Sequence, residues 1–168
     1  MDPMRFVLLL ALIACAASAQ THKVDGRWAP LGFLIGEWTG EGGGGPGEGT
    51  GGFSFLPDQD GKILVRKNRA DYPASKDRPA FSHTDLMIVY KEDSKLRAIY
   101  FDTEDHVIHY DVTPAADGKS VRFLSGNYRL TYTQTATDRV AIRFEVAAPG
   151  KPGAFETYID ASARRVRN

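Results

Sequence analysis

Residues 140–146 read VAIRFEV and residues 128–133 read YRLTYT, and in each segment large apolar side chains recur at every second position. Successive side chains of a β-strand point to opposite faces of a sheet, so this period predicts strands that bury one face. The same pattern returns roughly every ten residues along the chain, between short polar turns. Further strands are expected over 35–41, 52–56, 62–69, 86–90, 96–100, 108–112, 121–123 and 155–165.

The segments between these strands carry turn-forming residues. Asp117-Gly118 and Gly126-Asn127 are pairs that tolerate the positive φ angles of tight hairpins. No helical period extends over ten or more residues. Because a meander of sequential strands leaves exposed edges unless it closes, the sequence predicts an all-β fold, an antiparallel up-and-down barrel of about nine or ten strands. Two packed sheets are the alternative, since a period of two does not distinguish a barrel from a sandwich.

Two segments interrupt the strand pattern. Residues 40–52 read GEGGGGPGEGTGG, in which nine of thirteen residues are glycine. This run lacks the Gly-Lys-Ser/Thr ending of a phosphate loop, so it predicts a mobile hairpin connection, or in a functional reading a gate over a ligand cavity. Residues 71–81, with two prolines and mixed charge, predict a long surface loop.

The charge balance of the chain limits the kinds of partner that it is expected to bind. The 168 residues contain 21 Lys and Arg and 21 Asp and Glu, with an isoelectric point near 6.9. A neutral chain has neither the basic surface that binds a nucleic-acid backbone nor the polybasic surface that binds anionic lipid. The sequence therefore predicts one soluble domain with no nucleic-acid partner.

The first residues have the pattern of an export signal. Arg5 precedes a short apolar run and small residues that end at Ala19, which predicts a signal peptide over 1–19 and a single β-barrel domain over 20–168. Cys15 is the only cysteine, so disulfides and multi-cysteine zinc sites are excluded. Its surroundings also resemble a bacterial lipobox, in which case Cys15 carries a lipid. In either case we expect an exported protein, periplasmic or extracellular, with no transmembrane helix in the mature chain.

Catalytic and metal-binding patterns are absent from the sequence. No serine lies in a Gly-x-Ser-x-Gly motif, and cleavage removes or lipidates the cysteine. His106 and His109 are three residues apart on an expected strand and therefore point to opposite faces. The sequence predicts no catalytic residue and no metal ligand, although an acid–base pair assembled in space stays open.

Tyrosines are the candidate ligand-binding residues. If the more apolar face of each strand points inward, five phenols enter the barrel, and His106 shares that direction near a strand end. Five buried hydroxyl groups need five hydrogen-bond partners, so a partly hydrated cavity for an amphipathic small molecule suits them. Alternatively their hydroxyls reach solvent at the rim. The predicted ligand-binding residues are Tyr90, Tyr100, Tyr110, Tyr128, Tyr132 and His106.

The stretch PLGFLIGEWTGEG over residues 30–42 carries a resemblance to known proteins. Gly36-x-Trp38 on a first strand resembles the opening of lipocalin-type barrels of the calycin superfamily. The longer spacing that adds Gly40 and Gly42 resembles nitrobindin-type haem-binding barrels and related uncharacterised bacterial proteins. The resemblance implies a structural role: Trp38 closes the end of the barrel, Gly36 lets the chain bend, and the tryptophan packs against a basic residue of the last strand. Arg164 and Arg165 are the candidates.

The same resemblance raises the question of haem. Nitrobindin-like barrels supply the axial histidine from a strand near the C-terminus. The histidines of this chain are His22, His83, His106 and His109, and residues 110–168 contain none. The family's ligand therefore does not carry over, and we predict no haem and no other cofactor.

These observations favour an exported, non-catalytic barrel that binds a small amphipathic or hydrophobic molecule. An enzyme with its active site in the barrel mouth is an alternative, which paired carboxylates or a histidine–carboxylate contact inside the cavity would favour. A structural envelope protein with a filled barrel and a partner on its outer face is another, which a large exposed apolar patch would favour.

Overall fold

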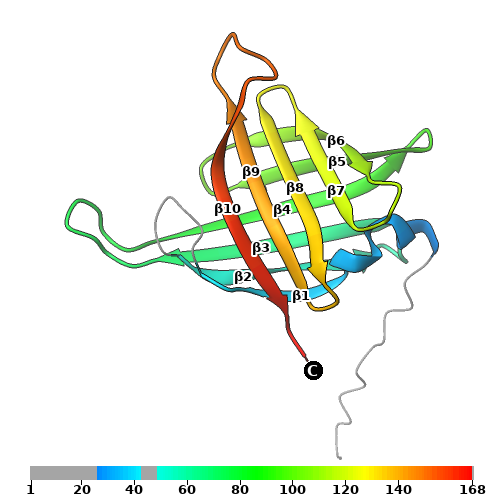
Figure 1. Cartoon of the computed structure of the whole chain (residues 1–168), viewed down its shortest axis with the longest axis horizontal. Helices are drawn as coiled ribbons and strands as arrows, with labels where there is room; N and C mark the ends of the chain where they lie inside the picture. The colour runs from blue at the N-terminus through cyan, green and yellow to red at the C-terminus, as the bar shows by residue number, and fades with distance from the viewer. Residues whose placement is uncertain (1–25, 43–48, 168) are drawn as a thin grey trace, which may run out of the picture.

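The computed structural model describes residues 26–42 and 49–167, and within them the chain forms one 3₁₀-helix and ten strands (Figure 1). The predicted signal peptide, Cys15, His22 and residues 43–48 of the glycine-rich segment lie outside the described residues. The elements are η1 (Gly26–Leu34), β1 (Gly36–Gly40), β2 (Thr50–Asp58), β3 (Ile63–Tyr72), β4 (Phe81–Glu92), β5 (Lys95–Asp102), β6 (Val107–Pro114), β7 (Ser120–Ser125), β8 (Tyr128–Ala136), β9 (Arg139–Ala147) and β10 (Phe155–Arg165).

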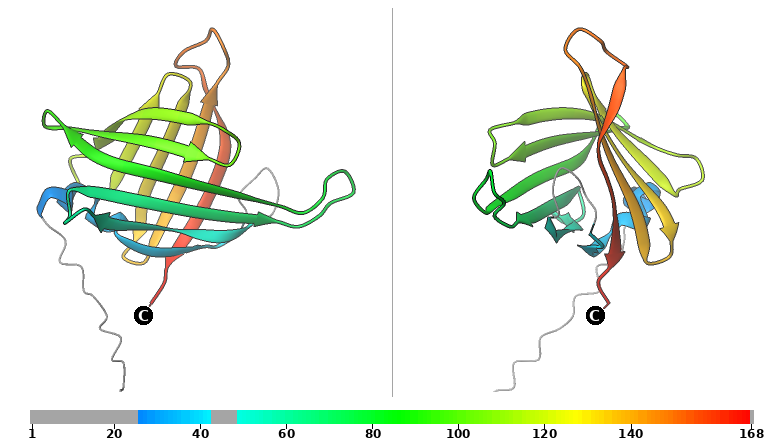
Figure 2. Two further views of the ribbon diagram at one scale, coloured as in Figure 1. Left: turned by 180° about the vertical axis from the view of Figure 1, so that it is seen from behind. Right: turned by 60° about the vertical axis from the view of Figure 1, so that its left-hand side comes forward.

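The strands form one closed antiparallel barrel. Each strand from β1 to β10 pairs with the next in the chain, and β10 pairs with β1 to close the sheet. The closing register places Trp38 opposite Arg165 and Gly40 opposite Ala163. Figure 2 shows the strands wrapping around a single interior. The barrel expected from the strand pattern is thus confirmed, and the two-sheet sandwich is excluded.

The turns follow from local backbone chemistry. The β4–β5 hairpin turns on Asp93 and Ser94, whose φ angles of 45° and 72° are those of the tight turns that match strand twist. The β3–β4 connection is shorter than predicted, because Asp71, Tyr72 and Phe81 belong to strands. The Tyr72 and Phe81 rings stack 4.6 Å apart, and this contact extends the hairpin that projects in Figure 1.

Helix η1 closes one end of the barrel. Trp28, Leu31 and Leu34 on this helix have no exposed surface. The indole Nε1 of Trp28 donates a hydrogen bond of 2.8 Å to the carbonyl of Gly61 in the β2–β3 turn. Burial of three large apolar side chains outweighs the poor hydrogen-bond geometry of a 3₁₀-helix. We call this end, with Trp38 and Arg165, the closed end.

Trp38 and Arg165 join the first strand to the last. The guanidinium of Arg165 lies over the Trp38 ring, 4.3 Å from its centroid, and donates hydrogen bonds to the carbonyls of Phe33 and Ile35. Arg164, the other candidate, is exposed and pairs with Glu41 at 2.9 Å. A guanidinium on an indole face contributes about 0.5–1 kcal/mol at exposed sites and more when desolvated.

Gly36 makes room for that arginine. Its φ is +127°, and a Cβ at this position would lie 2.6 Å from Arg165 Nη1. The backbone conformation therefore requires a glycine, and any side chain here would also displace the Arg165 guanidinium. The indole Nε1 of Trp38 donates to the carbonyl of Leu34 at 2.8 Å, which fixes the entry of η1 into β1.

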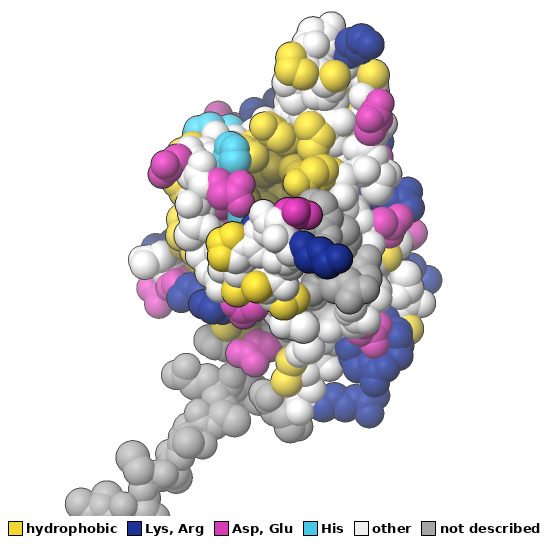
Figure 3. Space-filling view, turned by 90° about the vertical axis from the view of Figure 1, so that its left-hand side faces the viewer, with side chains coloured by type: hydrophobic (Ala, Val, Ile, Leu, Met, Phe, Trp, Pro, Cys, Tyr) yellow, Lys and Arg dark blue, Asp and Glu magenta, His cyan; other side chains and the backbone are white. Residues whose placement is uncertain are grey.

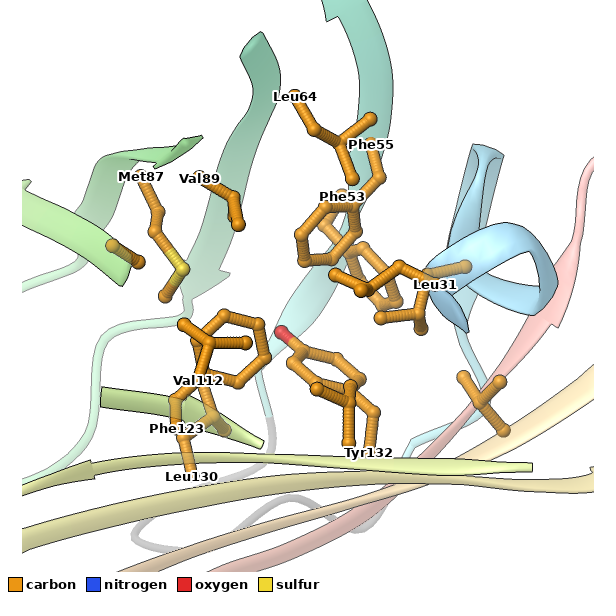
Figure 4. Close-up of a cluster of buried hydrophobic side chains, with 14 of the residues drawn as sticks. Leu31, Phe53, Phe55, Leu64, Met87, Val89, Val112, Phe123, Leu130 and Tyr132 are labelled. Atoms are coloured by element: carbon orange, nitrogen blue, oxygen red, sulfur yellow. The ribbon is translucent and has the colours of Figure 1, made fainter. Parts of the chain in front are cut away.

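Aromatic side chains fill the interior above the closed end. Phe53, Phe55 and Phe123 surround Tyr132, with ring centroids 5.6–6.1 Å from it (Figure 4). Edge-to-face arrangements of this kind add to the burial of apolar area. The half of the barrel next to η1 is therefore a packed core.

Candidate binding site at the open end

The half of the barrel opposite η1 is hollow. By strand register Ile108, Tyr128, Ile142 and Phe144 point into the barrel, yet each is only partly buried. An inward side chain in a closed barrel meets solvent only where the interior is open. Figure 3 shows the hollow at this end, with apolar side chains inside it and histidine and acidic side chains along one edge. We call this hollow the cup.

One side of the cup is apolar and aromatic. The rings of Tyr128 on β8 and Phe144 on β9 stack with centroids 6.0 Å apart, and Tyr158 on β10 meets Phe144 edge to face at 6.1 Å. Tyr158 reaches this position through a register shift between Thr157 and Ile159. This side, with Ile108 and Ile142, is the apolar wall.

The facing side, on β3 to β5, carries polar side chains at inward positions. We call it the polar wall and include two residues of the β5–β6 turn. Its members are Arg66, Asn68, His83, Asp85, Tyr100, Asp102, Glu104 and His106.

A buried ion pair forms the deepest part of the polar wall. Arg66 Nη1 donates to Asp85 Oδ1, and both side chains are less than a tenth exposed. Asn68 Nδ2 donates to the second carboxylate oxygen at 2.8 Å. Burial lowers the pKa of Arg66, but the attraction of Asp85 and of neighbouring phenols outweighs it, so the pKa is raised. A charge in this position is tolerated because it is paired.

His83 links the buried pair to the rim. Its Nε2 lies 3.5 Å from Asp85 Oδ2 and 3.3 Å from the Tyr100 hydroxyl, and its Nδ1 lies 3.2 Å from Glu104 Oε1. The hydrogen bond to Asp85, helped by Glu104 and opposed by burial, raises the pKa of His83. Only the imidazolium form donates to both carboxylates at once.

Asp102 fixes the turn at the rim. Its Oδ1 accepts hydrogen bonds from the backbone N–H groups of Glu104 and His106, and its Oδ2 accepts from the Tyr100 hydroxyl at 3.2 Å. The His106 ring also contacts Oδ2 at 2.9 Å. Burial alone would raise the pKa of Asp102, but these bonds to the His106 backbone, the His106 ring and Glu104 outweigh it and lower the pKa.

Four of the five predicted tyrosines point into the barrel. Tyr100 and Tyr128 lie in the cup, whereas Tyr110 and Tyr132 are buried below it. Burial raises the pKa of Tyr100, Tyr110 and Tyr132. The Tyr132 hydroxyl points into the interior (Figure 4), and the nearby Arg66 partly offsets the effect of burial on its pKa.

Tyr90 does not point into the barrel as predicted. It lies on the outer face of β4, because Met87 and Val89 are the fully buried side chains of that strand. The expectation failed since both faces of β4 are apolar, so the choice of the inward face by hydrophobicity was wrong. His106 also differs from its expected place: it lies in the exposed β5–β6 turn and not on a strand.

The polar wall was largely missed from the sequence. Arg66 shares its face with Leu64, and Asp85 shares its face with Met87 and Val89. A charged residue at the buried period of a strand is rare unless it is paired. This signal could have identified Arg66 and Asp85, but their pairing needs the register of β3 with β4.

The outer surface has two faces of different character. Over β7 to β10 a depression of about 480 Å³ is lined by Arg122, Arg129, Thr131, Thr133, Ala141, Arg143, Glu145 and Asp160. Over β3 to β5 a depression of about 450 Å³ includes Leu86 and Phe101. On this second face Phe101 and the neighbouring Val107 are exposed apolar side chains.

Within residues 26–42 and 49–167, no group of three His, Cys, Asp or Glu side chains is placed to hold a metal ion. The same residues contain no helix that is long and apolar enough to cross a membrane.

Comparison with known proteins supports the fold. No family model matches the chain, and no curated protein matches it. The crystal structure of Rv2717c from M. tuberculosis is similar, with a TM-score of 0.60 and 13% sequence identity over 86% of this chain and 99% of that one. A redesigned β-barrel gives a TM-score of 0.37 at 14% identity, over 84% of this chain and 96% of that one. The first likeness agrees with the lipocalin-like barrel that the Gly36-x-Trp38 motif predicted.

Proposed function

We propose that the protein binds a small amphipathic molecule in the cup. The observation that carries this proposal is that two chemically different walls face each other across an open interior. Inward side chains such as Phe144 and Tyr128 pack against the core but stay partly exposed, whereas a filled barrel would bury them completely. Ligand sites are typically concave, mostly apolar, and supplied with a few convergent polar groups.

This proposal can be tested by replacing a small inward residue with a large one that fills the cup. Ala161 points inward opposite Ile142, whereas Ala141 points outward opposite Ser162. We expect Ala161→Trp to abolish saturable binding of Nile red, measured by fluorescence titration, because the indole occupies the cup. The matched control Ala141→Trp should bind the dye like wild type. Equal binding by wild type and Ala161→Trp, with a native circular dichroism spectrum, would refute the proposal.

We further propose that the protein works outside the cytoplasm. The support is the apolar run and small residues before Ala19, together with the single cysteine within them. Intact mass of the mature protein from its own host distinguishes cleavage after Ala19 from lipidation of Cys15. A mass equal to the full chain would contradict export by either route.

An enzyme in the barrel mouth is the second candidate. The contacts of His83 with Asp85 and of His106 with Asp102 favour it, because a histidine oriented by a carboxylate is a common acid–base pair. Both carboxylates, however, already accept several hydrogen bonds from the protein. Native mass spectrometry of protein from its own host separates the two readings: an intact retained molecule supports binding, and a molecule whose mass changes on incubation supports catalysis.

A further inference from the structure

The proposed binding function leaves the ligand's polar group undefined, and the charges of the polar wall constrain it. Asp85, Asp102 and Glu104 supply three carboxylates, against one guanidinium from Arg66. The histidines His83 and His106 lie against these same carboxylates, so a proton that either carries is already paired within the wall. Arg66 is already paired with Asp85, so it offers no free positive charge to an anionic ligand. A carboxylate or phosphate group entering the cup would meet uncompensated negative charge.

The hydrogen bonds of the polar wall also favour a donor as the ligand's polar group. The donors of the polar wall point at its carboxylates: Asn68 donates to Asp85, Tyr100 donates to Asp102, and both nitrogens of His83 lie against acceptors. Glu104 is 57% exposed at the rim, so its carboxylate is accessible to a ligand. What the wall offers an incoming molecule is acceptors, which only a donor or a cation can use.

The polar wall already surrounds a side chain that can carry a positive charge. The imidazole of His83 lies between two carboxylates and next to the Tyr100 hydroxyl, and it is only about one-fifth exposed. The Tyr100 ring beside this imidazole and the Tyr128 ring across the cup add aromatic rings, whose π faces attract positive charge.

We infer that the cup selects amphipathic organic cations, with the ammonium group at the polar wall and the apolar body against Phe144, Tyr128 and Ile142. This inference rests on the proposed function. It deepens that function by naming the ligand's head group. The Nε of Arg66 does not oppose it, because that atom is buried and out of reach of a ligand.

Three probes with one body and different head groups test the inference: 4-phenylbutylamine, 4-phenylbutan-1-ol and 4-phenylbutyrate. We expect isothermal titration calorimetry at pH 8 to give the amine about tenfold tighter binding than the alcohol, and the carboxylate the weakest. The preference should shrink as salt is added, since part of the attraction is an accessible charge interaction.

Two variants test whether the ammonium group binds at the polar wall. Glu104→Gln, a change at an exposed rim position, should weaken amine binding about threefold to tenfold and leave alcohol binding unchanged. Asp160→Asn removes a carboxylate from the outer face, where it pairs with Arg143, and should change neither. Equal loss of amine and alcohol binding in Glu104→Gln would overturn the assignment of the head group to this wall.

The outcomes separate the two proposals. If the carboxylate probe binds as well as or better than the amine, the cation inference is wrong, while binding in the cup stands. If no probe binds but Nile red still does, the inference fails alone. If neither the probes nor Nile red bind, the proposed function fails with it.

Discussion

Both ends of this barrel carry inward aromatic side chains, but the closed end buries them and the open end leaves them partly exposed. At the closed end Trp38 is almost fully buried, its indole satisfied by a backbone carbonyl and covered by Arg165. At the open end Phe144 has the same inward direction but remains partly exposed. The difference is η1, which packs under the closed end and has no counterpart among the described residues of the other. The helix η1 thus covers the closed end, and the open end is left uncovered by any described element.

The largest effect should come from deleting the closed-end aromatic. We expect Trp38→Ala to lower the free energy of unfolding by about 3–5 kcal/mol, because it leaves a cavity and unpairs Arg165 from the ring. Phe144→Ala at the open end should cost less, about 2 kcal/mol, because its side chain is only partly buried. Urea denaturation of both variants measures the contrast. Equal losses would mean that the open end is packed as tightly as the closed one.

A second test compares a buried ion pair with an exposed one. Asp85→Ala leaves Arg66 charged and unpaired in the interior, so we expect a loss of about 3 kcal/mol in the free energy of unfolding. Asp160→Ala removes the partner of Arg143 on the outer face, where both side chains are more than half exposed, and should cost less than about 1 kcal/mol. Thermal melts followed by circular dichroism rank the two. A mild Asp85→Ala variant would show that water reaches Arg66.

The smallest effect is a pH dependence from His83, which faces Asp85 on its own strand, Tyr100 on β5 and Glu104 in the turn. Its pKa is raised on folding, so its contribution is complete below the unfolded value of about 6.5 and is lost as pH rises through the folded pKa. The stability difference between wild type and His83→Gln should therefore be larger at pH 5.5 than at pH 9. A stability difference that is the same at both pH values would contradict this role for His83.

Sequence reasoning found the barrel because strand alternation is local. The segments around Tyr132 and Phe144 repeat apolar side chains at every second residue, and the turns between strands carry residues suited to tight hairpins. The same reasoning placed Tyr90 inward, because Leu86, Ile88 and Tyr90 are as apolar as Met87 and Val89 on the opposite face of the strand. Alternation shows that a strand has two faces. Where both are apolar, it does not show which one meets the core.

The contacts within the polar wall could be identified only from the tertiary structure. Arg66 and Asp85 are nineteen residues apart and become partners through the register of β3 with β4. Glu104 and His83 meet because Asp102 holds the β5–β6 turn against the end of β4. Neither contact has a signature in sequence spacing, since a pair across a sheet is set by the length of the intervening hairpin.

By itself, then, the sequence determined the all-β class and a count of about nine or ten strands, because strand period and turn chemistry are properties of neighbouring residues. The resemblance at Gly36-x-Trp38 added the tryptophan that closes the barrel. The tertiary structure decided which end is closed, which arginine covers Trp38, and which face of β4 points inward. It also assembled the cup. These depend on how strands far apart in the chain come into register, and on one helix that packs under one end of the barrel.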